Sequence, residues 1–169
     1  PPRAGTFIYH THVSEIRQQL AGLAGALIVL DGSRTLDTTT DHVVLITTPP
    51  GYDEQRRAVL LNGSAQPPSL ELRAGVAHRL RLINITTNRP NIRVELWRGD
   101  SLLSWRPLAK DGADLADAAR MARPARSPIS IGETMDYEIV PAVGESRLEV
   151  RAAVGPPLGR MVIRGREGP

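Results

Sequence analysis

Residues 92–97 read Ile-Arg-Val-Glu-Leu-Trp, and residues 135–139 read Met-Asp-Tyr-Glu-Ile. In both stretches every second side chain is apolar, and most of the residues between are charged. Successive side chains of a β-strand point to opposite faces of the sheet, so this alternation predicts strands with one face in a core and the other toward solvent. These two stretches therefore favour a β-rich fold.

Further short stretches of this kind recur from residue 41 onward and are separated by turn residues such as Asn62-Gly63, Ala74-Gly75 and Gly99-Asp100. Repeated short strands with turns between them predict an antiparallel β-sandwich or barrel. We expect a long loop at 109–128 and strands at 42–47, 58–62, 69–73, 77–86, 92–97, 102–106, 134–140, 147–152 and 160–164.

The first part of the chain has a different order of predicted elements. We expect a strand over 6–13, a short helix with Ser14 as its N-cap residue, and a buried strand over 26–30. A polar linker follows at 32–40. A piece of about thirty residues cannot bury a core unaided. We therefore expect 1–32 to be the closing part of an upstream domain and 41–169 to be a second domain. Because the chain begins at Pro1 without a methionine, we also expect the protein to extend upstream.

Composition narrows the chemistry. Hydrophobic residues make up 41% of the 169, enough for a real core, and there is no cysteine. Disulfides, zinc–thiolate sites, a cysteine nucleophile and the thiolate of a blue-copper centre are thus excluded within this sequence.

The net charge is +3, and the basic residues are nearly all arginine, with Lys110 the only lysine. The arginines are interleaved with Asp and Glu, which favours solvated charged faces over nucleic-acid binding. No apolar stretch approaches the roughly 20 residues that span a membrane.

His10-Thr11-His12 is the pattern with evident chemistry. Side chains at i and i+2 of a strand share a face, about 6.6 Å apart along the strand. Two such imidazoles can bind one metal, or each can bind one metal of a close pair. Imidazole suits copper, zinc, iron and nickel, so the spacing leaves the metal open. Taken by itself, the pattern is also compatible with two histidines that simply face solvent.

The other polar candidates have simpler explanations. His42 and His78 each stand alone at the start of a predicted strand, so we interpret them as structural or exposed. Lys110, Asp111 and Asp114 flank a loop glycine and indicate a turn rather than acid–base chemistry.

Ser14 has no acid partner or oxyanion hole nearby in sequence, so helix capping explains it better than serine catalysis. Arg3 and Arg17 can pair with carboxylates or support the histidines, and the sequence does not decide between these roles. Trp97 and Trp105 are expected to cover sheet edges or a domain interface.

Residues 1–12, Pro-Pro-Arg-Ala-Gly-Thr-Phe-Ile-Tyr-His-Thr-His, followed by Gly-Leu-Ala-Gly-Ala-Leu-Ile-Val-Leu-Asp at 22–31, resemble the end of the first cupredoxin domain of laccase-like multicopper oxidases. Segments 60–63, 70–75, 79–84, 109–112 and 131–137 resemble the opening and later strands of that family's next domain. The resemblance covers nearly the whole chain. It implies an all-β fold, a cupredoxin-like Greek-key β-sandwich or barrel preceded by a partial cupredoxin domain, with no copper site in the second domain.

The resemblance also implies a role for the two histidines: His10 would bind one copper of the coupled, or type 3, pair and His12 the other. The implied cofactor is copper, with type 2 and type 1 ligands outside this chain. The implied activity is oxidation of phenolic or similar small reducing substrates, or of metal ions, coupled to reduction of dioxygen to water. The implied partners are the remaining cupredoxin segments, on the same protein or on companion chains. The implied location is periplasmic or extracellular.

The sequence departs from the family in lacking its His-Trp-His-Gly, His-X-X-His-X-His and His-Cys-His motifs. These residues alone therefore complete neither a three-copper cluster nor a blue-copper centre. Two alternatives stay open: a copper-free, cupredoxin-like binding or scaffold protein, and a stand-alone interaction module formed by 41–169. The oligomeric state and the substrate are not fixed by the resemblance.

Overall fold

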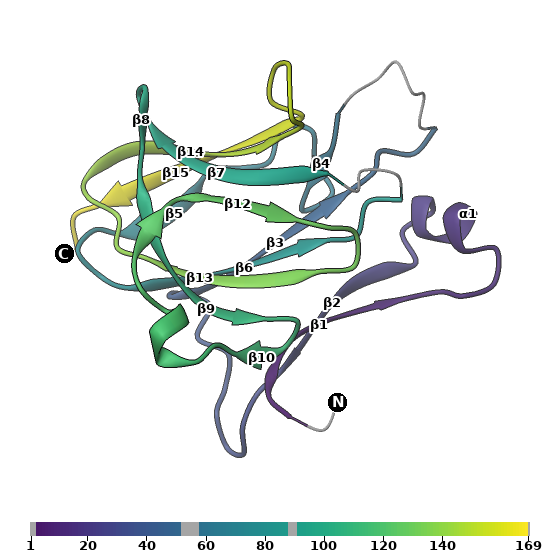
Figure 1. Cartoon of the computed structure of the whole chain (residues 1–169), viewed down its shortest axis with the longest axis horizontal. Coiled ribbons are helices and arrows are strands. Elements are labelled where there is room, and N and C mark those ends of the chain that lie inside the picture. The colour runs from purple at the N-terminus through teal and green to yellow at the C-terminus, as the bar shows by residue number, and fades with distance from the viewer. Residues whose placement is uncertain (1–2, 52–57, 88–90, 169) are drawn as a thin grey trace.

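The computed structural model describes residues 3–51, 58–87 and 91–168. Two β-sheets pack face to face as a sandwich, and a separate β-hairpin lies against one of them (Figure 1). The predicted β-rich sandwich is confirmed. Within the described residues, no helix is long and apolar enough to cross a membrane.

The first sheet is the one that carries the hairpin. Its strand order is β10-β9-β13-β6-β3-β4, with β11 paired to β9. Neighbouring strands are antiparallel except for β3 and β6, which run parallel. The strands are β3 (Asp41–Thr47), β4 (Leu60–Leu61), β6 (His78–Asn84), β9 (Ser104–Lys110), β10 (Ala113–Asp114), β11 (Arg123–Pro124) and β13 (Thr134–Ile139).

The second sheet closes the other side of the core. Its order is β12-β7-β14-β15-β5, with β8 paired to β7, and only the β15–β5 pair is parallel. The strands are β5 (Leu70–Arg73), β7 (Ile92–Arg98), β8 (Ser101–Leu102), β12 (Arg126–Ile129), β14 (Gly144–Arg151) and β15 (Gly159–Arg166).

The core between the sheets is mainly aliphatic, as the composition requires, with one aromatic pair at its centre. Trp105 is 2% exposed and stacks on Tyr137 with ring centroids 3.9 Å apart. The expectation that Trp105 covers an edge or an interface is therefore wrong, because β9 places its ring inside the sandwich. Trp97 instead lies on the outer face of β7 and donates to Glu95 Oε2.

The predicted loop at 109–128 is wrong in extent. The strand expected at 102–106 is divided into β8 and β9, and β9 continues to Lys110. The segment that follows holds β10, a 3-10 turn η1 (Asp117–Ala119), β11 and most of β12. The strands among these pieces are two to four residues long; β10 and β11 pair with β9, and β12 pairs with β7. Strands that short carry too few residues to show an alternating pattern.

The N-terminal residues form an antiparallel hairpin of β1 (Gly5–His10) and β2 (Ala24–Val29), joined through the helix α1 (Glu15–Leu20). The hairpin lies along the first sheet, with β1 in contact with β13 and β10, and α1 projects beyond the sandwich (Figure 1). The predicted strand at 6–13 is too long. The last pair of the hairpin is His10 with Ala24, and past it the chain has no partner strand and turns toward α1.

A buried polar network ties this hairpin to the sandwich. Thr6 Oγ1 donates to Asp136 Oδ2 at 2.9 Å and accepts from Arg81 Nη1 at 2.7 Å. Arg79 Nε also donates to Asp136 Oδ2 at 2.9 Å, and Arg81 makes two 2.6 Å hydrogen bonds to Asp41. Because Thr6 is fully buried, the hairpin and the sandwich share one desolvated set of charges.

Candidate metal centre

His10 and His12 lie together at the outer end of the hairpin. His10 is the last residue of β1, whereas His12 lies in a bend beyond the strand. The expectation that both occupy one strand is therefore wrong, but the rings are still neighbours, with centroids 4.7 Å apart and planes tilted by 39°. The turn at Thr11 brings the second ring closer to the first than an extended strand would.

The Nδ1 atom of His10 faces acceptors from its own loop and from α1. It lies 3.1 Å from the Thr11 carbonyl oxygen and 3.3 Å from Glu15 Oε1. Gln19 Nε2 is also 3.1 Å away, and the same amide donates to Glu15 at 3.0 Å. The Thr11 carbonyl and the Glu15 carboxylate can only accept, whereas the Gln19 amide nitrogen can only donate, and it already donates to Glu15. The two acceptors together favour the tautomer with the proton on Nδ1. That tautomer leaves the lone pair of His10 on Nε2.

Helix α1 supplies these partners, although its start differs from the prediction. Ser14 precedes the helix at φ 50 and ψ 43, and its side chain makes no capping hydrogen bond. The predicted hydroxyl cap is wrong because the left-handed backbone turns the residue away; Ser14 acts through its carbonyl, which accepts from Gln18 N at 3.0 Å. Glu15 and Gln19 are four residues apart, so they share one helix face and reach His10 together.

The two histidines fit part of a metal site and not a whole one. A hollow of about 330 Å³ lies beside His10, between α1 and the chain at 85–87. His12 is exposed and makes no side-chain hydrogen bond to any residue that the structure describes. Across the described ranges, no group of three or more His, Cys, Asp or Glu side chains is placed to hold a metal ion. These two residues can therefore supply two imidazole ligands, which is fewer than a complete metal site needs.

His42 and His78, interpreted from sequence as single histidines, are paired. His42 Nε2 lies 3.1 Å from His78 Nδ1, and His78 Nε2 lies 3.0 Å from the Arg73 carbonyl oxygen. The carbonyl must accept, so His78 carries its proton on Nε2 and its Nδ1 accepts from His42. Burial and the neighbouring His78 lower the pKa of His42, which favours the neutral form of His42. The pairing depends on β3 and β6 lying side by side, and a separation of 36 residues gave no sign of it.

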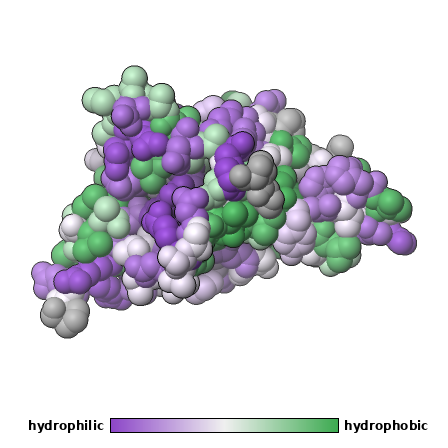
Figure 2. Space-filling view, turned by 90° about the horizontal axis from the view of Figure 1, so that it is seen from below, coloured by the Kyte–Doolittle hydropathy of each residue, from purple (hydrophilic) through white to green (hydrophobic). Residues whose placement is uncertain are grey.

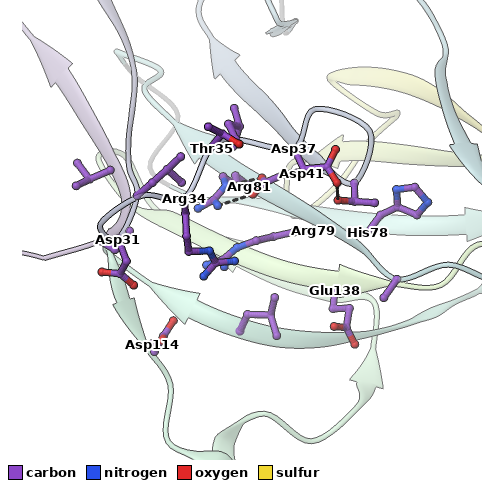
Figure 3. Close-up of a pocket in the computed structure, with 18 residues that line it drawn as sticks. Asp31, Arg34, Thr35, Asp37, Asp41, His78, Arg79, Arg81, Asp114 and Glu138 are labelled. Carbon is purple, nitrogen blue, oxygen red and sulfur yellow. Dashed lines mark hydrogen bonds and ion pairs between the residues drawn. The ribbon is translucent and has the colours of Figure 1, made fainter.

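A polar cleft of about 350 Å³ lies at the other end of the hairpin, where the linker after β2 crosses β6 (Figure 3). Arg34 from the linker and Arg79 from β6 reach into it, and the Arg81–Asp41 ion pair forms one side. Gly5 lines this cleft and His10 does not. Most of its charges are already paired within the protein, Arg79 with Asp136 and Glu138 with Arg106, so the cleft is chiefly a structural junction.

The loop residues Asp111 and Lys110 serve the turn after β9. Asp111 has φ 48, and its carboxylate accepts from Thr134 N at 3.0 Å, while Lys110 pairs with Glu133 at 2.8 Å. Asp114 lies in β10, exposed and 3.7 Å from Arg120.

The two arginines near the histidines in sequence do not support them in space. Arg3 donates to the Gly112 carbonyl at 2.8 Å, at the end of the hairpin away from His10. Arg17 is exposed on α1 and has no ion-pair partner among the described residues.

No protein-family model matches the chain, and no curated protein matches it either. Solved structures do match it. The chain aligns over 98% of its length with a multicopper oxidase from Pseudomonas thermotolerans, at 23% identity and a TM-score of 0.71. It aligns over 98% of its length with the multicopper oxidase of Aquifex aeolicus, at 20% identity and a TM-score of 0.73. It shares its fold with the multicopper oxidases. A blue copper oxidase from Nitrosomonas europaea agrees, at 18% identity, 98% coverage and a TM-score of 0.70.

The multicopper-oxidase likeness establishes the all-β, cupredoxin-like architecture that the sequence resemblance implied. The chain spans only part of these proteins, namely 41% of the Pseudomonas, 42% of the Aquifex and 57% of the Nitrosomonas chain. At identities below 25%, the likeness concerns the fold, and the roles of individual side chains have to be argued from their own geometry.

Proposed function

We propose that the chain is part of a copper-dependent, laccase-like oxidase, in which His10 binds one copper of a type 3 pair and His12 the other. The observation that carries the proposal is the placement of the two rings, with centroids 4.7 Å apart at the open end of a hairpin. The shared multicopper-oxidase fold over nearly the whole chain supports the choice of copper among the metals that imidazole binds.

The residues around His10 prepare it as a ligand. The Thr11 carbonyl and the Glu15 carboxylate hold a proton on Nδ1 and leave Nε2 free to donate its lone pair. Such partners fix the tautomer and orientation of a metal-binding histidine, and their removal typically weakens metal binding about 10–100-fold. Glu15, held by Gln19, is therefore proposed as a positioning residue.

Copper bound in this way would supply the electron-transfer chemistry that reduces dioxygen to water, with electrons drawn from phenolic or similar small substrates or from metal ions. The contribution of this chain is to present two neutral imidazoles and to hold the Nδ1 proton of His10. The type 1 and type 2 copper ligands belong to the remaining cupredoxin segments, on the same protein or on companion chains. The proposed location is the periplasm or the cell exterior.

Exposed apolar residues of the hairpin and α1 support a two-part organisation, in which 1–32 completes an upstream cupredoxin domain and 41–169 forms a second one without a copper site. Figure 2 shows hydrophobic surface at the projecting end of the molecule that carries α1. A surface of this kind on a small hairpin is explained if the rest of that domain packs against it. The exposed large hydrophobic residues of the hairpin, of α1 and of the turns beside it are Tyr9, Val13, Ile16, Leu23 and Leu27.

The test is to measure copper content and oxygen consumption in the full-length protein that carries this chain. We expect His10→Ala and His12→Ala each to lower bound copper and to abolish oxygen consumption. His42→Ala is the matched control, because it removes a histidine that is already hydrogen-bonded to His78 at 3.1 Å. Glu15→Ala should keep both histidines but lose copper to a competing chelator at a lower chelator concentration.

Two results would count against the proposal. Copper-free wild-type protein would favour the scaffold alternative, and equal copper content in His10→Ala, His12→Ala and His42→Ala would place the metal elsewhere. If all variants keep the unfolding midpoint of the wild type, loss of copper is not a consequence of misfolding.

A further inference from the structure

The outer face of the second sheet has two carboxylates at its centre that face each other across neighbouring strands. Glu95 on β7 and Glu149 on β14 are register partners, and they are 1% and 2% exposed. Like charges directly opposite each other on a sheet are destabilising. Their burial on an outer face, with no second layer of backbone above them, requires that other side chains cover and neutralise them.

Five arginines do this. Arg93 and Arg126 donate through Nε to Glu95 Oε1 at 2.6 and 2.7 Å. Arg160 Nη2 donates to Glu149 Oε1 at 2.8 Å, and the remaining two, Arg147 and Arg151, bind Glu149 at 2.9 and 2.6 Å. We call this set the arginine face: Arg93, Arg126, Arg147, Arg151 and Arg160. Five guanidinium groups over two carboxylates leave an excess of three positive charges.

The excess of positive charge on the arginine face persists over a wide pH range. Burial opposes ionisation of Glu95 and Glu149, but hydrogen bonds from the arginines outweigh it and hold the pKa of each carboxyl below its ordinary value. The guanidinium groups stay protonated throughout. The carboxylates are thus fully charged and the surface above them is still cationic.

The arginine face has guanidinium N–H donors that a ligand outside the protein can reach. Arg126 and Arg160 stand at the two ends of the row that crosses β12, β7, β14 and β15, and they are 51% and 55% exposed. Among the residues that the structure describes, Arg93 and Arg126 make hydrogen bonds through Nε to Glu95 and none through their terminal nitrogens, which can bind other acceptors. Three inter-strand spacings separate the ends of the row, about 14 Å at 4.7–4.9 Å each. A guanidinium fork matches carboxylate and other oxyanions with two parallel hydrogen bonds.

We propose that the arginine face binds a linear acidic polysaccharide, a polymer that carries a carboxylate on its sugars. A stable protein interface has an apolar core, and a membrane-binding surface inserts apolar side chains, but none of the exposed large hydrophobic residues in the described chain lies on β7, β12, β14 or β15. A single-stranded nucleic acid would need aromatic platforms, and the one aromatic ring here, Trp97, lies beneath Arg126 with the guanidinium carbon 6.0 Å from its centroid. A hydrated chain with spaced carboxylates fits a flat, cationic sheet face better than either.

The arginine face could not be recognised in the sequence. Its arginines are scattered from residue 93 to residue 160 and interleaved with Asp and Glu, so the sequence indicates solvated charged faces without grouping them. The sheet brings five of them together because β12, β7, β14 and β15 are neighbours. The site does not involve the histidines, so this inference stands or falls independently of the copper proposal.

The probe is an oligogalacturonate of about eight sugars, titrated by calorimetry into the full-length protein at low salt. We expect saturable binding that weakens as salt is raised, because the attraction is between charges near the surface. Arg126→Gln/Arg160→Gln should weaken binding at least tenfold. The charge-matched control is Arg34→Gln/Arg106→Gln, which removes two arginines that lie outside the arginine face and should change Kd less than twofold.

Several outcomes would overturn the inference: no binding at low salt, the same loss of affinity in both double variants, or tighter binding of a single-stranded oligonucleotide or of anionic phospholipid vesicles than of the oligogalacturonate. If the double variant unfolds early, Arg160→Gln alone is the substitute, since Glu149 keeps Arg147 and Arg151. A loss of at least threefold in that single variant supports the site, and an unchanged Kd refutes it.

Discussion

Replacing Asp136 with asparagine would show how much the buried network between hairpin and sandwich stabilises the protein. Asp136 is 1% exposed, and one of its oxygens accepts from Thr6, Arg79 and Arg81. The other oxygen, Oδ1, has no hydrogen-bond partner in the described structure, so an asparagine can place its NH2 group there and keep the shape of the site. The change therefore removes charge with little change in packing.

The expected magnitude follows from burial. Removing one partner of a buried ion pair typically costs about 3–5 kcal/mol, because the other charge is left uncompensated. Arg81 is 4% exposed, and after the substitution Asp41 is its one remaining ion-pair partner among the described residues. Since that second pair survives, we expect Asp136→Asn to cost about 3 kcal/mol, at the lower end of that range.

Glu138→Gln is the matched control. Glu138 lies two residues along the same strand, and its ion pair with Arg106 is 2.8 Å long but partly open to solvent, with the two side chains 27% and 45% exposed. Exposed pairs contribute about 0–1 kcal/mol. Urea denaturation followed by circular dichroism gives both free energies of unfolding, and an unchanged m-value shows that the comparison is sound. The reasoning is falsified if the two variants lose the same stability, or if Asp136→Asn loses less than about 1 kcal/mol.

Three further substitutions or conditions test other parts of the fold. Trp105→Ala should cost about 3–5 kcal/mol by urea denaturation, since it empties the centre of the core. Gly112→Ala should lower the thermal midpoint by several degrees, because Gly112 has φ 71 and a Cβ there would overlap the Phe7 ring; an unchanged midpoint would mean that the hairpin does not pack on this turn. In an acid titration, burial opposes ionisation of Glu95 and Glu149, but arginine hydrogen bonds keep the pKa of each lowered. Their contribution to stability is complete above the ordinary carboxyl pKa of about 4.3 and is lost as the pH falls through the lower folded values. The thermal unfolding midpoint should therefore decrease as the pH is lowered below about 4.3. In Glu95→Gln/Glu149→Gln it should decrease less steeply with pH.

Alternation along the chain was enough to find most of the sandwich, because each strand has one face in the core. The same alternation misplaced Glu95 and Asp136, which it assigned to solvent and which are 1% exposed. The sequence of a strand indicates which face of the sheet each residue occupies. The arginines that cover these two carboxylates come largely from other strands. Burial of a charged residue on an outer face is a property of neighbouring strands, which one strand's sequence does not record.

The sequence identifies the two histidines of the candidate site, but it predicts the wrong backbone conformation for them. His10 and His12 were expected to share a strand, but the strand ends at His10 because β2 begins at Ala24. The pairing of His42 with His78 was missed for a similar reason, since it depends on β3 lying parallel to β6. The roles of Glu15 and Gln19 follow from α1 folding back toward the hairpin, and a four-residue helical spacing is the signal that would have suggested them.

The two tryptophans have different surroundings, and this gives the protein two separate optical reporters. Trp105 is buried in the core against Tyr137, so its fluorescence will change when the sandwich unfolds. Trp97 lies among charged side chains with Arg126 over its ring, so its emission will respond to what binds or leaves that surface. A protein that retains only Trp105 thus reports on unfolding, and one that retains only Trp97 reports on that surface as long as the sandwich stays folded.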